Sequence, residues 1–501
     1  MLKKDSLINL SGISKLKGAI IFSVCYLILE LILASFHEMW RDEIQAWSIT
    51  FNSHSLSELF YLSRHEGHGK LWYLILYFLQ IFHCSIYYMK LIHVLIATFF
   101  VFIFYYFSPF KTIEKILICF GYYFFYEYAV ISRDYSIELL FLFLCLSIYL
   151  KYRERYLILN SVLFLILFQT NIYAIIIGIP LYIYVISDLL KAKSISKKTF
   201  FKSLIIVVSG LIISIYFLIP PDDQGMAGSW IFRFDSAIFI DLLTRIYTGY
   251  FPFPQLKIEF WNTNFIDSFD NFQLIQIILS FLSLICITLI FRRKIKIMLL
   301  FYSGTFGLLI FTYIKYFGYQ RHHGQLFILF VLCLWIYLSE LKSLPSSTKQ
   351  NFNALLKYFI LLLIIVNFSA TGVATYYEIN YPFSNAAAAG EYLKSNSLDT
   401  MNIAGDEYPA SSISGLLNKE IYFPQSKRFS IFVVFDNKWH WLPTQGIIDE
   451  ANNHFKTLNE NYLLILTFPI DSIPSNWQFL KGFDNSIVGD ENYYIYQVNT
   501  K

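Results

Sequence analysis

Long apolar runs are the feature that most constrains how this chain of 501 residues folds. A helix needs roughly 20 consecutive apolar residues to cross a bilayer. Only 15% of the residues are charged, against about 25% in soluble proteins. The runs lie at about 19–36, 88–107, 113–131, 135–150, 156–169, 171–187, 202–219, 272–291, 297–314, 322–340 and 354–376. The sequence therefore predicts an all-α polytopic membrane protein with about 11 transmembrane helices.

Basic residues between the runs predict the orientation, because Lys and Arg collect on the cytoplasmic side of a membrane. The clusters are Lys111 and Lys115; Lys151, Arg153 and Arg155; Lys191, Lys193, Lys197 and Lys198; Arg292, Arg293, Lys294 and Lys296; and Lys342 and Lys349. All of them fall inside if the short apolar run 71–83 lies in a long outer loop and does not cross. We therefore expect a multi-pass protein of the plasma (inner) membrane, with an uncleaved signal anchor and an extracytoplasmic C-terminus.

Composition and charge divide the chain into three parts. Residues 1–18 are expected to be a cytoplasmic N-terminus, and residues 19–376 a transmembrane domain with outer loops at about 37–87 and 220–271. After about residue 380 the apolar runs end. There the pattern predicts a helix over 385–395, N-capped by Ser384, and strands over 401–405, 420–423, 462–468 and 493–498. Residues 380–501 are thus predicted to form a small extracytoplasmic α/β domain.

Cysteine usage and net charge argue against several classes of protein. The six cysteines lie nearly all in apolar runs and show no CxxC spacing, so neither a disulfide framework nor a zinc site is expected. A divalent metal is not indicated, although the sequence leaves that question open. The net charge of +4 is too small to indicate nucleic-acid binding.

The polar cluster after the first run is the clearest candidate for chemistry. The segment FHEMWRDEIQAW places Asp42 and Glu43 at the membrane boundary, where a carboxylate pair could supply a general base to a lipid-borne substrate. The competing interpretation is a solvated amphipathic segment with Trp40 and Trp47 at the interface. A second cluster, RHEGHGKLWY at 64–73, has the start of an interfacial helix as its competing interpretation.

Two more clusters put positive charge on the outer side, against the general trend. Arg133 lies in YEYAVISRDYS and Arg321 in KYFGYQRHHGQ, and an arginine offers two parallel donors to a phosphate. The competing interpretations are a structural Arg–Asp pair and ordinary contact with lipid headgroups. Asn171, in FQTNIY, is a polar break between two apolar runs, and its competing interpretation is a simple turn residue. All these positions meet on the outer face in one topology, which favours a shared site.

Two of these segments carry a resemblance to a known family. WRDEIQAW followed by EGHGKLWY resembles the first outer loop of bacterial GT-C superfamily glycosyltransferases, which are related to protein O-mannosyltransferases and the lipid A aminoarabinose transferase. EYAVISRDYS is similar to that family's second outer loop. The family pattern has prolines where this chain has Gly69 and Lys70. The resemblance covers about residues 15–340 and implies a GT-C type fold.

The resemblance implies transfer of a sugar from a polyprenyl-phosphate donor to a lipid, glycan or protein acceptor on the outer face, with membrane lipids as further partners. Asp42 would deprotonate the acceptor hydroxyl, and Glu43 would orient either Asp42 or the acceptor. The expected donor-phosphate ligands are Arg133, Lys315, Arg321, His322 and His323. Other expected substrate contacts are Arg41, Glu66, His68, Asp134, Tyr135 and Asn171. The alternatives are a transporter or flippase of lipid-linked sugars, and a glycan polymerase or ligase.

Overall fold

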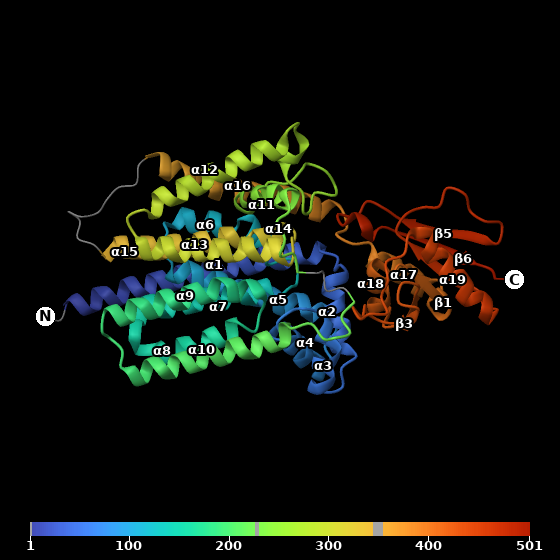
Figure 1. Cartoon of the computed structure of the whole chain (residues 1–501), viewed down its shortest axis with the longest axis horizontal. Coiled ribbons are helices and arrows are strands. Elements are labelled where there is room, and N and C mark those ends of the chain that lie inside the picture. Colours follow the sequence, from blue (N-terminus) through green and yellow to red (C-terminus); the bar gives the residue numbers. More distant parts are fainter. Residues whose placement is uncertain (1–2, 226–229, 344–353, 501) are drawn as a thin grey trace.

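A bundle of long helices forms one end of the molecule and a small sheet domain the other (Figure 1). The structure, a computed structural model, describes residues 3–225, 230–343 and 354–500; Lys349 of the last basic cluster lies outside them. The long helices are α1 (Lys3–Phe36), α5 (Tyr87–Phe107), α7 (Tyr135–Tyr152), α9 (Ile172–Lys191), α10 (Lys197–Leu218), α12 (Phe272–Phe291), α13 (Ile295–Ile314), α15 (Gln325–Ser343) and α16 (Ala354–Asn380). The predicted all-α membrane class is therefore confirmed.

Within the described residues, nine stretches are long and apolar enough to cross a membrane, where the sequence predicts about 11. One of the nine, Tyr135–Leu167, contains two of the expected runs. It breaks at Arg153, whose φ is +52°, into α7 and α8 (Leu157–Leu167), which pack against each other. The expected run 113–131 is divided between α6 (Thr112–Cys119) and the π-helical turn η2 (Tyr122–Glu127), so neither piece is long enough alone.

Burial separates the centre of the bundle from its lipid-facing shell. Helices α7 and α15 are buried along most of their length, whereas α10 and α12 leave large apolar side chains exposed, including Ile205, Ile212 and Phe281. Hydrocarbon solvates such side chains as well as a protein core does. The exposed apolar surface is therefore what a membrane-embedded bundle requires.

Short helices gather at the end of the bundle that faces the sheet domain (Figure 1). They are α2 (Arg41–Phe51), α3 (Leu56–Leu62), α4 (Leu71–Ile81), α11 (Ser236–Tyr250) and α14 (Gln320–His323). Helix α4 covers most of the apolar run 71–83, and its 11 residues span only about 16 Å, roughly half the hydrocarbon thickness. Its length agrees with the prediction that this run does not cross.

The C-terminal domain is a six-stranded mixed sheet with helices, as its predicted α/β class requires. The strand order is β3-β2-β1-β4-β6-β5, with β1 parallel to β2 and β4 and the other pairs antiparallel. The strands are β1 (Asn402–Gly405), β2 (Ile421–Phe423), β3 (Arg428–Ser430), β4 (Tyr462–Leu466), β5 (Trp477–Phe483) and β6 (Tyr493–Val498), and the helices are α17 (Ala386–Ser395), α18 (Glu407–Leu417) and α19 (Thr444–Leu458).

The predicted strands correspond to β1, β2, β4 and β6, and the predicted helix is α17. Ser384 accepts a hydrogen bond from the Ala386 amide at 3.1 Å, although the capping position itself belongs to Asn385. Helix α18 packs directly on α2. The sheet domain is therefore in contact with α2, the helix that carries the acidic pair.

Candidate functional site

Asp42 lies in the first turn of α2 and meets two arginines that are distant in the sequence. Its Oδ2 atom accepts a short hydrogen bond from Arg133 and lies 3.6 Å from Nη2 of Arg321. Burial alone would raise the pKa of Asp42, but the two guanidinium groups outweigh it and hold that pKa below its ordinary value. The side chain stays 32% exposed. Asp42 is therefore an ionised carboxylate that a substrate can reach.

Arg321 is buried, yet two of its donors have no partner. Its side chain is only 6% exposed, and Nε and Nη1 make no hydrogen bond to any described residue. The aromatic rings of Trp40, Trp261 and Tyr319 surround the guanidinium carbon at 5.1–5.3 Å from their centroids. Buried unpaired donors are costly, and an anion placed against them would remove that cost.

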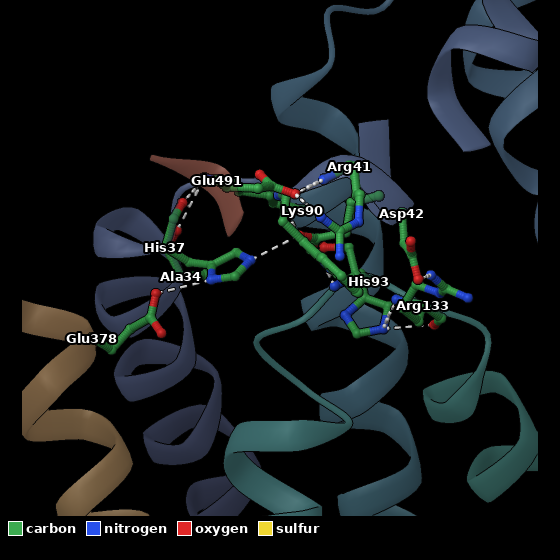
Figure 2. Close-up of polar contacts among 12 residues, drawn as sticks. Ala34, His37, Arg41, Asp42, Lys90, His93, Arg133, Glu378 and Glu491 are labelled. Atoms are coloured by element: carbon green, nitrogen blue, oxygen red, sulfur yellow. Dashed lines mark hydrogen bonds and ion pairs between the residues drawn. The ribbon is translucent and has the colours of Figure 1, made fainter. Parts of the chain in front are cut away.

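Arg133 is held in place by groups from two other segments. Its Nη2 atom lies 3.2 Å from Nε2 of His68, and Nδ1 of the same ring lies 3.7 Å from Asp134. His93 of α5 contacts the backbone of Arg133 at 2.9 Å (Figure 2). Burial and the positive charge of Arg133 lower the pKa of His68 to about 3, so the ring is neutral and can accept from Arg133. Burial raises the pKa of Asp134 to about 6.

Glu43, the other half of the acidic pair, belongs to a separate buried network. One oxygen lies 2.9 Å from Nε2 of His37, and the other accepts from the Ser132 amide at 2.6 Å. The opposite nitrogen of His37 lies 2.9 Å from Glu378 near the end of α16 (Figure 2). All three ionisable side chains are fully buried. We call Glu43, His37 and Glu378 the carboxylate–histidine clamp; it ties the start of α2 to α16.

We expect the carboxylate–histidine clamp to stabilise the protein in a pH-dependent way. Burial lowers the pKa of His37, but the carboxylates of Glu43 and Glu378 raise it to about 9 overall, against about 6.5 in an unfolded chain. The stabilisation is thus complete below pH 6.5 and is lost as the pH rises through 9. At pH 6.5, His37→Gln should cost about 3–5 kcal/mol, as expected when a buried ion pair loses one partner.

The measurement is the thermal unfolding midpoint of the purified protein between pH 6 and pH 10. The difference in unfolding midpoint between the unchanged protein and His37→Gln should become smaller as the pH rises. His54→Gln, at an exposed position on the same outer loop, should leave the midpoint unchanged at every pH. A gap of constant size across this range would mean that the ring is neutral in the folded protein.

Three of the predicted substrate contacts are occupied by protein groups. Arg41 pairs with Asp490 of the sheet domain at 2.7 Å. Glu66 accepts from Gln45 at 2.9 Å and from Tyr73 at 3.1 Å. Asn171 caps α9 through the Ala174 amide and donates to Glu138, both at 2.9 Å. The role of these three residues in substrate binding stays a prediction, and each now also has a structural role.

The remaining predicted phosphate ligands contact other protein groups. His322 sits among Tyr173, Tyr316 and Tyr135, with Nδ1 accepting the Tyr319 amide at 2.7 Å. His323 points elsewhere, since its Nε2 lies 2.9 Å from the Phe317 carbonyl. Lys315 lies over the ring of Trp230 at 5.2 Å. The geometry therefore brings Arg133 and Arg321 to Asp42, and ties His323 and Lys315 to neighbouring loops.

Sequence reasoning missed several residues that build the site. Trp261 and Tyr319 wall Arg321, and Glu378 completes the clamp. One feature of the sequence could have identified Glu378, since it is an acidic residue at the end of an otherwise apolar run. Among the described residues, no group of three or more His, Cys, Asp or Glu side chains is arranged to hold a metal ion.

The fold and site define a polytopic membrane protein with a carboxylate–diarginine site where the helix bundle meets its sheet domain. No family model and no curated protein matches the sequence. Among solved structures, the chain is similar to the crystal structure of ArnT from Cupriavidus metallidurans bound to undecaprenyl phosphate. The identity is 10% and the TM-score 0.48, over 96% of this chain and 98% of that one.

Proposed function

We propose that this protein is a glycosyltransferase that moves a sugar from a polyprenyl-phosphate-linked donor to an acceptor hydroxyl. The observation that carries the proposal is the pairing of a reachable, ionised Asp42 with a buried Arg321 that has two unpartnered donors. A carboxylate can accept a proton, and fixed guanidinium groups can bind a phosphate. Sugar transfer from a lipid phosphate needs both groups within reach of one anomeric carbon.

In the proposed reaction, Asp42 takes the proton of the acceptor hydroxyl as its oxygen attacks the anomeric carbon. The bond between that carbon and the donor phosphate oxygen breaks, and the lipid phosphate leaves with the electron pair. Negative charge grows on the leaving phosphate, so Arg321 and Arg133 stabilise the transition state more than the ground state. Arg133, now paired with Asp42, would exchange part of that contact for the phosphate.

Glu43 has a different role in this proposal from that of Asp42. Its two oxygens are occupied by His37 and the Ser132 amide, and its side chain is fully buried. A substrate therefore has no access to it. We assign Glu43 as a positioning residue, which fixes the first turn of α2 and with it the carboxylate of Asp42.

We also propose that the site faces the extracytoplasmic side, with residues 1–18, 19–376 and 380–501 as N-terminus, membrane domain and outer domain. The basic clusters between α7 and α8, between α9 and α10 and between α12 and α13 support this orientation, because these helix ends lie away from the sheet domain (Figure 1). In a Cys84→Ser background, Ser475→Cys should react with an impermeant thiol reagent in intact cells, and Ser194→Cys should be shielded. Both positions are exposed. Labelling at residue 194 from outside would show that the orientation is the reverse of the proposed one.

The function is tested directly with purified protein and a set of polyprenyl-phosphate sugars. We expect release of the polyprenyl phosphate, dependent on protein and accelerated by a suitable acceptor hydroxyl. The acceptor set should contain lipid, glycan and peptide hydroxyls, because the site does not distinguish among them. Movement of an intact lipid-linked sugar across a vesicle membrane, with no release of polyprenyl phosphate, would instead support a flippase.

A further inference from the structure

A polar cavity lies at the opposite end of the helix bundle from Asp42. It has a volume of about 380 Å³ and is formed between α1, α5, α7 and α15. Lys15 and Lys151 line it together with Trp335 and Phe107. These residues lie near the N-terminal end of α1 and the C-terminal ends of α5, α7 and α15, away from the sheet domain (Figure 1). The cavity is large enough for a small ligand.

Four lysines from four helices lie close enough to repel one another at this end of the bundle, and two of them, Lys15 and Lys151, line the cavity. Lys15 belongs to α1, Lys115 to α6, Lys151 to α7 and Lys342 to α15. The charges of Lys151 and Lys342 repel that of Lys15, and Lys15 and Lys342 in turn repel Lys115. Among the described residues, none of the four forms an ion pair with a carboxylate. We call this group the lysine cluster.

The lysines instead contact carbonyl groups and aromatic rings. Lys115 is buried and donates to the Tyr105 carbonyl at 2.5 Å, and Lys342 donates to the Pro109 carbonyl at 2.6 Å. Lys15 lies 5.1 Å above the ring of Tyr106, and Lys151 lies 5.2 Å above that of Phe107. These contacts orient the ammonium groups, but they leave the excess positive charge uncompensated.

Three other cations at this end of the bundle do have a carboxylate partner. Arg153 and Lys296 both pair with Asp188, at 2.8 and 3.1 Å. Glu340, the carboxylate in the cavity wall, pairs with Lys294 at 2.7 Å. The carboxylate in the cavity wall is therefore already used, and the cavity keeps a net positive lining.

We propose that this cavity binds the phosphate group of an anionic glycerophospholipid from the surrounding leaflet. Lipid phosphates lie at the ends of membrane spans, and basic pockets between such helices bind acidic headgroups. The ammonium groups of Lys15 and Lys151 contact the phosphate, while the rings of Trp335 and Phe107 flank the glycerol part. The lipid supplies the counter-charge that the lysine cluster lacks. This site is separate from the proposed transfer reaction and does not depend on it.

The test uses the full chain in nanodiscs of phosphatidylcholine with and without phosphatidylglycerol. Native mass spectrometry counts the phosphatidylglycerol that stays bound on release from the disc. Lys15→Gln/Lys151→Gln should weaken retention about 30-fold, since each lysine near a headgroup contributes about fivefold. The matched control, Lys17→Gln/Lys191→Gln, removes two exposed lysines that do not line the cavity. Its retention should equal that of the unchanged protein.

Three outcomes would overturn the proposal. Equal loss in the two double variants would show that surface charge alone holds the lipid. If inorganic phosphate raises the unfolding midpoint of the detergent-solubilised protein as much as phosphatidylglycerol does, the cavity is a site for free anions. Unchanged retention in Lys15→Gln/Lys151→Gln would place the lipid elsewhere. If that double variant unfolds early in phosphatidylcholine alone, the single variants Lys15→Gln and Lys151→Gln replace it, and each should weaken retention about fivefold.

Discussion

Asp42→Asn should lower the rate of sugar transfer by about 10²–10⁴-fold, the usual effect of removing a general base. The amide keeps the size of the side chain and an oxygen that accepts from Arg133, so the protein should still fold. It cannot take the proton of the acceptor hydroxyl. The measurement is polyprenyl phosphate release from the donor by purified protein at saturating acceptor, alongside the unfolding midpoint.

Two variants separate a chemical effect from a structural one. Asp490→Asn makes the same change at an exposed carboxylate that pairs with Arg41. Its free energy of unfolding should stay within about 0.5 kcal/mol of that of the unchanged protein. Glu43→Gln breaks the carboxylate–histidine clamp, so its loss of rate should come with a lower unfolding midpoint. Near-normal transfer by Asp42→Asn would remove Asp42 from the mechanism.

Arg321→Met should reduce kcat/KM for the lipid donor on the order of 10²–10³-fold, as when a donor to a developing oxyanion is removed. Methionine keeps the apolar stem between Trp40 and Trp261 while deleting the charge. Because Nε and Nη1 are buried without partners, the unfolding midpoint should be no lower than that of the unchanged protein. Loss of donor use without loss of stability is the result expected of a ligand-binding arginine.

Two further variants test whether the guanidinium shape matters. Arg321→Lys should recover only part of the activity, because an ammonium group lacks the two parallel donors of arginine. Arg233→Met, at an exposed position on the loop before α11, is the matched control and should keep normal donor kinetics. Normal donor kinetics in Arg321→Met would show that the donor phosphate binds elsewhere.

The helical membrane class, the short surface helix and the C-terminal domain could be predicted from the sequence, because each depends on local composition. Apolar length decides whether a segment can cross a bilayer, and α4 is too short in sequence and in structure alike. The number of spans was harder to predict. The positive φ at Arg153 and the π-helical turn after Cys119 are local backbone departures that hydropathy does not encode.

Part of the candidate site was also visible in the sequence. Asp42, Arg133 and Arg321 stood out because charged residues are rare near apolar runs, so each needed an explanation. The partition of the acidic pair was not visible. Asp42 and Glu43 are adjacent, but on a helix neighbouring residues point about 100° apart. One therefore meets the arginines and the other meets His37.

The sequence by itself thus determined the helical membrane class and which ionisable residues stand next to the apolar runs. Only the tertiary structure decided which carboxylate meets which cation. Arg133 and Arg321 reach Asp42 because the loop before α7 and the short helix α14 pack beside α2. Glu378 reaches His37 because α16 ends there. Such contacts join residues 91 to 341 positions apart, and their strength depends on burial and distance, which no local pattern records.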